Sequence, residues 1–149
     1  MSKVQLALAG LAGRISHLHE LTHAGIALSS AAVLEEALEI AITARMPNLN
    51  RSMRDKLFDG YGPLASLSAK SDIAFALGIV DKATHSKLAV VRKVRNKFAH
   101  SASIITFEQI DIAALLAPLK VPDASNADER VFYLSVVRSV SMTLRHLAS

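Results

Sequence analysis

Apolar residues recur every three or four positions along much of this chain, and that spacing predicts helices that bury one face. The longest example runs from Arg14 to about Met46, and Pro47 is expected to close it. Its recurring apolar positions are Ala27, Ala31, Leu34, Leu38 and Ile42. Three glutamates, Glu35, Glu36 and Glu39, stand among them, so this helix carries charged positions as well as core positions.

Breaking and capping residues divide the next part of the chain into shorter helices. We expect one helix over 51–58, followed by a Gly-Tyr-Gly-Pro loop that contains Gly62 and Pro63. Another is expected over 63–77, where Gly78 stops it. Asp81 predicts the N-cap of a helix over 82–99.

Two more helices complete the predicted fold. Thr106 with Gln109 resembles a capping box ahead of a helix that Pro118 ends, and Asn126 with Glu129 resembles another, ahead of a final helix to about 147. No run alternates with the period of a strand. We therefore predict an all-α protein, a compact bundle of about six or seven helices forming a single domain over 1–149.

Composition agrees with this fold class and narrows the function. Apolar residues make up 51% of the 149 positions and aromatic residues only 5%, which is typical of helix formers. With no cysteine, disulfides and thiolate metal sites are excluded, and a cytoplasmic location is expected. The net charge of +4 is too small to indicate nucleic-acid binding by itself. We expect neither a signal peptide nor a membrane-spanning segment.

The stretch His19-Glu20-Leu21-Thr22-His23 matches the zinc-protease pattern H-E-x-x-H. On a helix the two histidines lie one turn apart, and Glu20 could activate a bound water. A catalytic zinc ion needs a third protein ligand, however, and the extended pattern fails because Ile26 and Ser29 replace its glycine and last histidine. Glutamates further along the same predicted helix are too distant. We expect solvated or hydrogen-bonded histidines here, with no metal and no cofactor.

The end of the helix expected over 82–99 carries the most informative chemistry. Its apolar stripe is formed by Leu88, Val91, Val94 and Phe98. Its remaining surface is crowded by Arg92, Lys93, Arg95 and Lys97, with Asn96 and His100 beside them. Arginine offers planar charged donors to a phosphodiester, and histidine can move a proton near neutral pH. This pattern favours a phosphate or nucleic-acid site at Arg92, Lys93 and Lys97.

Two interpretations of Arg95 remain open. In the structural one, Arg95 forms an ion pair with Glu35 or Glu36 of the long helix, because charged residues beside a core are usually paired. In the functional one, it acts together with His100. Five residues separate the two, about 140° around an ideal helix. A joint site therefore needs the helix to end near His100, or a second copy of the chain to supply one of the two residues.

Several of these segments together resemble the mannitol operon repressor family (MltR-like proteins). Members show a leucine-phenylalanine pair before a Gly-x-Gly-Pro-Leu loop, a helix ending in Ala-Leu-Gly and a helix end of the form R-x-x-R-N-x-F-A-H-S. Here these are Leu57-Phe58, Gly60 to Leu64, Ala76 to Gly78, and Arg92 to Ser101. The resemblance spans about residues 24–101, although Lys70 stands where an arginine is common and the zinc-like letters are not part of the pattern. Structural roles are expected for Glu35, Glu36, Gly62, Pro63 and Gly78.

Arg95, Asn96 and His100 also resemble the R-N-x-x-x-H signature of the wider HEPN superfamily of small helical proteins, many of which are metal-independent ribonucleases. This resemblance implies that Arg95 binds phosphate and stabilises the transition state. It implies His100 as general acid and base at the RNA 2′-hydroxyl, with Asn96 in support. In that superfamily the Arg and His of two protomers face each other across a cleft.

The sequence thus leaves competing functions. One is a transcriptional regulator of the mannitol operon repressor type, which acts through a protein partner rather than through a DNA-reading motif of its own. The alternative is a HEPN-type ribonuclease or RNA-binding protein that uses Arg95, Asn96 and His100. A helix-turn-helix over about 72–99 is a weaker match, because its turn is too long. We expect a homodimer under either leading hypothesis, since short helices in a small chain leave apolar surface to cover.

Overall fold

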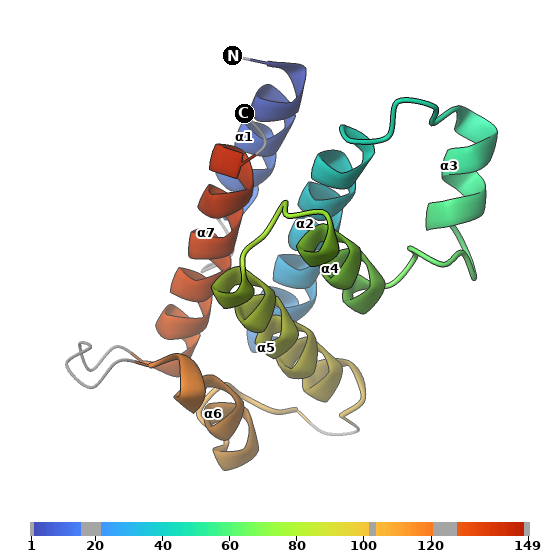
Figure 1. Cartoon of the computed structure of the whole chain (residues 1–149). Coiled ribbons are helices and arrows are strands. Elements are labelled where there is room, and N and C mark those ends of the chain that lie inside the picture. Colours follow the sequence, from blue (N-terminus) through green and yellow to red (C-terminus); the bar gives the residue numbers. More distant parts are fainter. Residues whose placement is uncertain (1, 16–21, 102–103, 121–127, 148–149) are drawn as a thin grey trace.

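The computed structural model describes residues 2–15, 22–101, 104–120 and 128–147. Within these residues the chain forms α1 (Lys3–Ile15), α2 (His23–Thr43), α3 (Arg51–Phe58), α4 (Leu67–Ala76), α5 (Lys82–Ala99), α6 (Ile110–Leu116) and α7 (Glu129–Leu147). They contain no strand (Figure 1). The predicted all-α bundle is therefore confirmed. No helix in these ranges has the length and apolar character that crossing a membrane requires.

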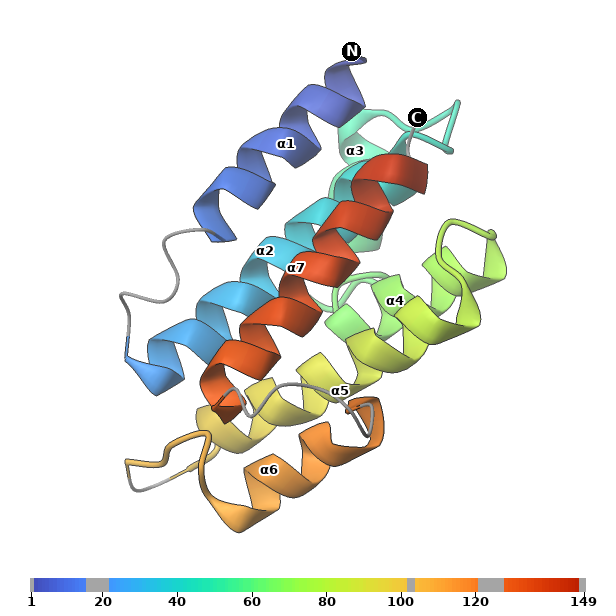
Figure 2. The same ribbon diagram turned by 90° about the vertical axis from the view of Figure 1, so that its left-hand side faces the viewer.

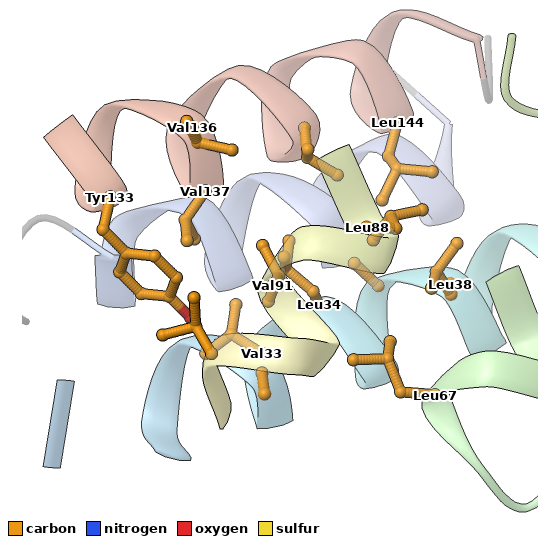
Figure 3. Packing of buried hydrophobic residues seen from close by; sticks show 14 of the residues in the cluster. Val33, Leu34, Leu38, Leu67, Leu88, Val91, Tyr133, Val136, Val137 and Leu144 are labelled. Carbon is orange, nitrogen blue, oxygen red and sulfur yellow. The ribbon is translucent and has the colours of Figure 1, made fainter. Parts of the chain in front are cut away.

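Helix α2 lies at the centre, in contact with α1, α4, α5 and α7 (Figure 2). Small side chains such as Ala27 and Ala37 are 0% and 1% exposed, and they let neighbouring helices approach closely. Branched residues fill the remaining space: Leu34 and Leu38 face Leu88 and Val91 of α5 in the core (Figure 3). Because several helices surround it, α2 is buried over much more than one stripe.

The sequence placed the long helix too early. Instead of one helix from Arg14, the structure has Arg14 in the last turn of α1, and α2 starts after Thr22, whose hydroxyl accepts the Gly25 N–H at 3.1 Å. Helix α1 packs on α2 and α7 through Leu8 and Leu11. The apolar N-terminal run is therefore a core helix of this bundle.

The single-residue cap that the sequence predicted is present, whereas a predicted two-residue capping box is not. Asp81 caps α5 as expected: its Oδ1 accepts the Thr84 N–H at 2.8 Å, and this hydrogen bonding lowers the pKa of the Asp81 carboxyl. The capping box at Thr106 is not formed, because α6 begins after Gln109, which makes no side-chain capping bond. Asn126 lies outside the described residues. In the first turn of α7 the Val131 N–H donates to Asp128 Oδ1 at 2.8 Å.

Helices α4 and α5 form a hairpin that depends on Gly78. This residue has φ +75°, and its N–H bonds to Phe75 O at 3.0 Å while the Ile79 N–H bonds to Ala74 O at 2.8 Å. These paired bonds close the end of α4 as a Schellman motif. A side chain would be strained in this left-handed conformation, which explains the structural role that the sequence predicted.

Gly62 has a different constraint, which is a close backbone approach. A Cβ built there would lie 2.5 Å from Leu57 O and 2.6 Å from Lys56 O. The Leu57 carbonyl also accepts the Leu64 N–H at 2.8 Å, so it is fixed in place. Pro63 follows in the same exposed loop, which joins α3 to the rest of the bundle.

We predict that Gly62→Ala lowers the free energy of unfolding by about 1–3 kcal/mol, because backbone must shift to admit the methyl group. Gly10→Ala is the matched control: its Cβ meets nothing within 4 Å in the interior of α1. There the substitution should raise stability by about 0.5–1 kcal/mol. Chemical denaturation measures both, and equal effects at the two sites would contradict the steric explanation.

Candidate functional site

The last turns of α5 line an open groove against α6. We call it the basic groove, and its volume is about 540 Å³. Its walls are Lys93, Asn96, Lys97, His100, Ser101, Ile105, Gln109, Asp111 and Leu115. The four α5 residues follow the spacing i, i+3, i+4 and i+7, so they form one face of the helix. Apolar residues of the opposite face, including Val94 and Phe98, are buried in the core.

The charge of the groove comes from α5 itself. This helix contains six lysine and arginine residues and no acidic residue. The groove has one acidic counterpart, Asp111, whose carboxylate lies 3.7 Å from Lys97 Nζ. Both side chains of that pair are about half exposed (52% and 55%), so their attraction is weakened by solvent. Lys93 has no ion-pair partner among the described residues. The groove therefore remains positively charged.

Two of the three residues expected to act as a catalytic set reach the groove. Asn96 and His100 both line it, and His100 is the exposed C-cap residue of α5. Arg95 instead bonds to its neighbour in the sequence: its Nη1 donates to Asn96 Oδ1 at 3.1 Å. Helix α5 ends at Ala99, as a joint site within one chain would require. Arg95 is nonetheless absent from the groove lining and is joined to it through Asn96.

The structural interpretation of Arg95 is not supported. In the described residues no ion pair joins Arg95 to Glu35 or Glu36. Glu36 instead forms an ion pair with Arg14 of α1, in which Arg14 Nη2 lies 2.7 Å from Glu36 Oε2. Both side chains are more than half exposed. The sequence left this pairing open beside a joint site with His100. It also assigned Arg14 to the same helix as Glu36, whereas Arg14 belongs to the neighbouring helix α1.

Arg92 lies apart from Lys93 and Lys97, the other two residues predicted to bind phosphate. Lys93 and Lys97 line the basic groove, but Arg92 lines a separate cavity between α4 and α5. The division follows from helix geometry, because adjacent residues are rotated by about 100° around the axis. Consecutive cations in the sequence therefore face different neighbours.

Two exposed isoleucines, Ile104 and Ile110, form an apolar rim beside the basic groove that the sequence did not predict. Ile104 is 96% exposed, and it lines an apolar cleft that shares Ser101 and Ile105 with the basic groove. Ile110 is 88% exposed and stands between the groove residues Gln109 and Asp111. The available signal was the Ile104-Ile105 pair after the end of α5, outside any helical period. Large apolar residues so fully exposed beside cations are typical of a protein interface.

The structure describes only part of the segment that matches the zinc-protease pattern. His19 and Glu20 lie outside the described residues, whereas His23, the second histidine of the pattern, lies within them. His23 Nδ1 accepts the Phe107 N–H at 3.0 Å, and its ring lies 5.3 Å from the Phe107 ring. Among the described residues, no three potential ligand side chains gather to hold a metal ion. His23 therefore connects the first turn of α2 to the segment that precedes α6.

The class of fold follows from these elements: an all-α bundle around a central buried helix, with an open basic groove at one end. A solved structure with this fold is the X-ray structure of the MtlR–HPr complex from Escherichia coli. The TM-score is 0.62 and the identity 19%, over 93% of this chain and 96% of that one. This chain therefore has an MtlR-like fold, as the sequence resemblance implied. No family model and no curated protein matches the sequence.

We predict that His23→Ala lowers the free energy of unfolding by about 1–3 kcal/mol, because it leaves the part-buried Phe107 N–H without its acceptor. His100→Ala, which removes an exposed side chain, should change it by less than about 0.5 kcal/mol. EDTA should leave the melting temperature of the unmutated protein unchanged. A loss of stability in EDTA that His23→Ala abolishes would restore the zinc hypothesis.

Proposed function

We propose that this chain is a regulator of the mannitol operon repressor type that acts by binding a protein partner, with HPr as the candidate. The observation that carries this proposal is the MtlR-like fold over 93% of the chain, in a structure solved with HPr bound to MtlR. The chain would act through protein contacts, because the described helices present a groove and rim suited to a protein.

The basic groove and its apolar rim are the proposed partner-binding face. Protein interfaces place apolar anchors at the centre of contact and use charges around them for orientation and fast association. Here Ile104 and Ile110 supply exposed apolar surface, and Lys93 supplies an exposed cation without a counter-ion in the described residues. This arrangement fits a partner surface that combines an apolar patch with acidic side chains.

The direct test is calorimetric titration of the purified chain with HPr from the same genome. Lys93→Glu should weaken binding by about tenfold or more, because it sets like charges against each other at the interface. Lys82→Glu is a matched control, an exposed lysine of the same helix at its opposite end. It should bind as the unmutated chain does. No binding by the unmutated chain, or equal losses in both variants, would contradict the proposal.

A second candidate is the HEPN-type ribonuclease, favoured by one observation. Asn96 and His100 line the same open, positively charged groove, and Arg95 is hydrogen-bonded to Asn96. In this function Arg95 binds phosphate, His100 transfers protons, and Lys93 and Lys97 attract the RNA backbone. We propose that a two-fold pair of chains would bring the Arg95 of one protomer toward the His100 of the other.

This second function predicts RNA cleavage by the pure protein in EDTA. Cleavage of tRNA and mRNA should disappear in His100→Ala and persist in Arg138→Gln, which removes an exposed arginine of α7. Light scattering should show a dimer at micromolar concentration. Intact RNA after incubation with the unmutated chain, or a strict monomer, would leave partner binding as the function of the groove.

A further inference from the structure

The cavity between α4 and α5 has features that the proposed partner-binding face does not use. Its volume is about 190 Å³. Its lining is Leu67, Ser68, Ser71, Asp72, His85, Leu88, Ala89 and Arg92. On α5, His85, Leu88, Ala89 and Arg92 share one face, and the facing residues of α4 lie in its first two turns. None of these residues lines the basic groove.

Two donors in this cavity have no hydrogen-bond partner in the part of the chain that the structure describes. Ser71 is only 5% exposed, and its hydroxyl makes no hydrogen bond with the described residues. Arg92 is half-buried, and its guanidinium has no hydrogen-bond or ion-pair partner among them. The Ser71 Oγ opens to the cavity, since the sealed polar atoms without a partner among the described residues are Glu129 Oε2 and Tyr133 OH. The guanidinium and this hydroxyl are therefore both available to a ligand that offers acceptor atoms.

The surrounding charges favour a negative acceptor. Arg92 shares the cavity lining with Leu67 and Ser68, the first two residues of α4. The N-terminus of a helix attracts anions through its free N–H groups and its dipole. Lys70, from the same turn, is 5% exposed, and its Nζ is held by the Ala65 carbonyl at 3.0 Å.

Asp72 is the one acidic residue in the cavity lining, and one of its carboxylate oxygens is already in contact with a histidine. Its Oδ1 lies 2.9 Å from His85 Nε2, and the His85 ring is stacked on Phe75 with centroids 4.8 Å apart. A metal cation would thus meet a carboxylate bound to histidine, an arginine and the positive end of a helix. Only an acceptor-rich anion complements the unpaired donors.

The cavity size limits the ligand. Pockets for drug-sized molecules are roughly 300–1,000 Å³, well above the volume here. We propose that this cavity binds a small phosphate-type oxyanion, held by Arg92, Ser68 and Ser71 at the start of α4. The oxyanion is either free inorganic phosphate or the phosphoryl group of a small phosphomonoester. Arginine is suited to it because its planar donors match tetrahedral oxyanions in paired hydrogen bonds.

The test is calorimetric titration of the full chain with inorganic phosphate and, separately, with a glycerol phosphate, at constant ionic strength. Saturable binding of either is expected, and tighter binding of the ester would identify a phosphoryl group as the natural ligand. Arg92→Gln should weaken binding by about tenfold or more, because it removes a charge-assisted hydrogen bond. Ser71→Ala should weaken it by a smaller factor.

Two controls separate this site from the rest of the surface. Arg138→Gln and Arg51→Gln remove exposed arginines of α7 and α3 that do not line the cavity; both variants should bind the anion as the unmutated chain does. Circular dichroism establishes that each variant is folded, and Ser71→Ala decides the question if Arg92→Gln is not. The proposal is overturned if the unmutated chain shows no saturable binding of either ligand, or if both cavity variants bind unchanged. Failure of HPr binding would leave this proposal standing.

Discussion

The burial of α2 is the constraint on which the rest of the structure depends. Four helices pack against it, and its alanines allow them to come close while Leu34 and Leu38 fill the space between. Helix α5 can join this core only through its apolar stripe, which contains Leu88, Val91 and Val94, each 0% exposed. Once that stripe is buried, the rotation of α5 is fixed. Its cations are then forced to the outside, where they meet α4 on one flank and α6 on the other.

This rotation divides the charge of α5 into two sites. Arg92 is directed to the α4 flank, while Lys93 and Lys97 are directed to the α6 flank. Among the described residues, Asp111 forms an ion pair with Lys97, whereas the carboxylate of Asp72 contacts His85 and no lysine or arginine of α5. Self-repulsion of such a helix opposes folding, so unpaired cations at hollows indicate a binding role more strongly than a stabilising one. The same reasoning connects the partner-binding face and the anion cavity to a single helix.

The fold class and α5 could be predicted from the sequence because their signals are local. Asp81 caps its own helix, the apolar stripe has a regular period, and Gly78 marks a turn that only glycine enters easily. The break between α1 and α2 was missed because neither glycine nor proline marks it; the start of α2 depends on Thr22. The capping box predicted at Thr106 is not formed. Its four-residue pattern does not show where the tertiary fold lets the helix begin, which here is after Gln109.

The candidate site was predictable only in part, for a related reason. Its α5 wall was singled out from residue types, and the structure places Asn96 and His100 in one groove. The role of these residues there stays a prediction. The opposite wall, with Asp111 and the exposed Ile110, depends on how α6 docks, and no local pattern gives that docking. A pair between Arg95 and Glu35 or Glu36 was left open because the sequence does not show which helices lie nearest to one another. The packing of the core decides which helices are neighbours, and a local sequence pattern does not contain that information.

The most direct test of the account is to observe which residues respond when a partner binds. Amide chemical shifts of the isotope-labelled chain should be followed by NMR during titration with HPr. The account predicts changes concentrated at residues 93–101 and 104–115, with α1 and α3 unaffected. Changes centred on α3 or α1, with the end of α5 silent, would contradict the claim that the basic groove is where this bundle meets its partner.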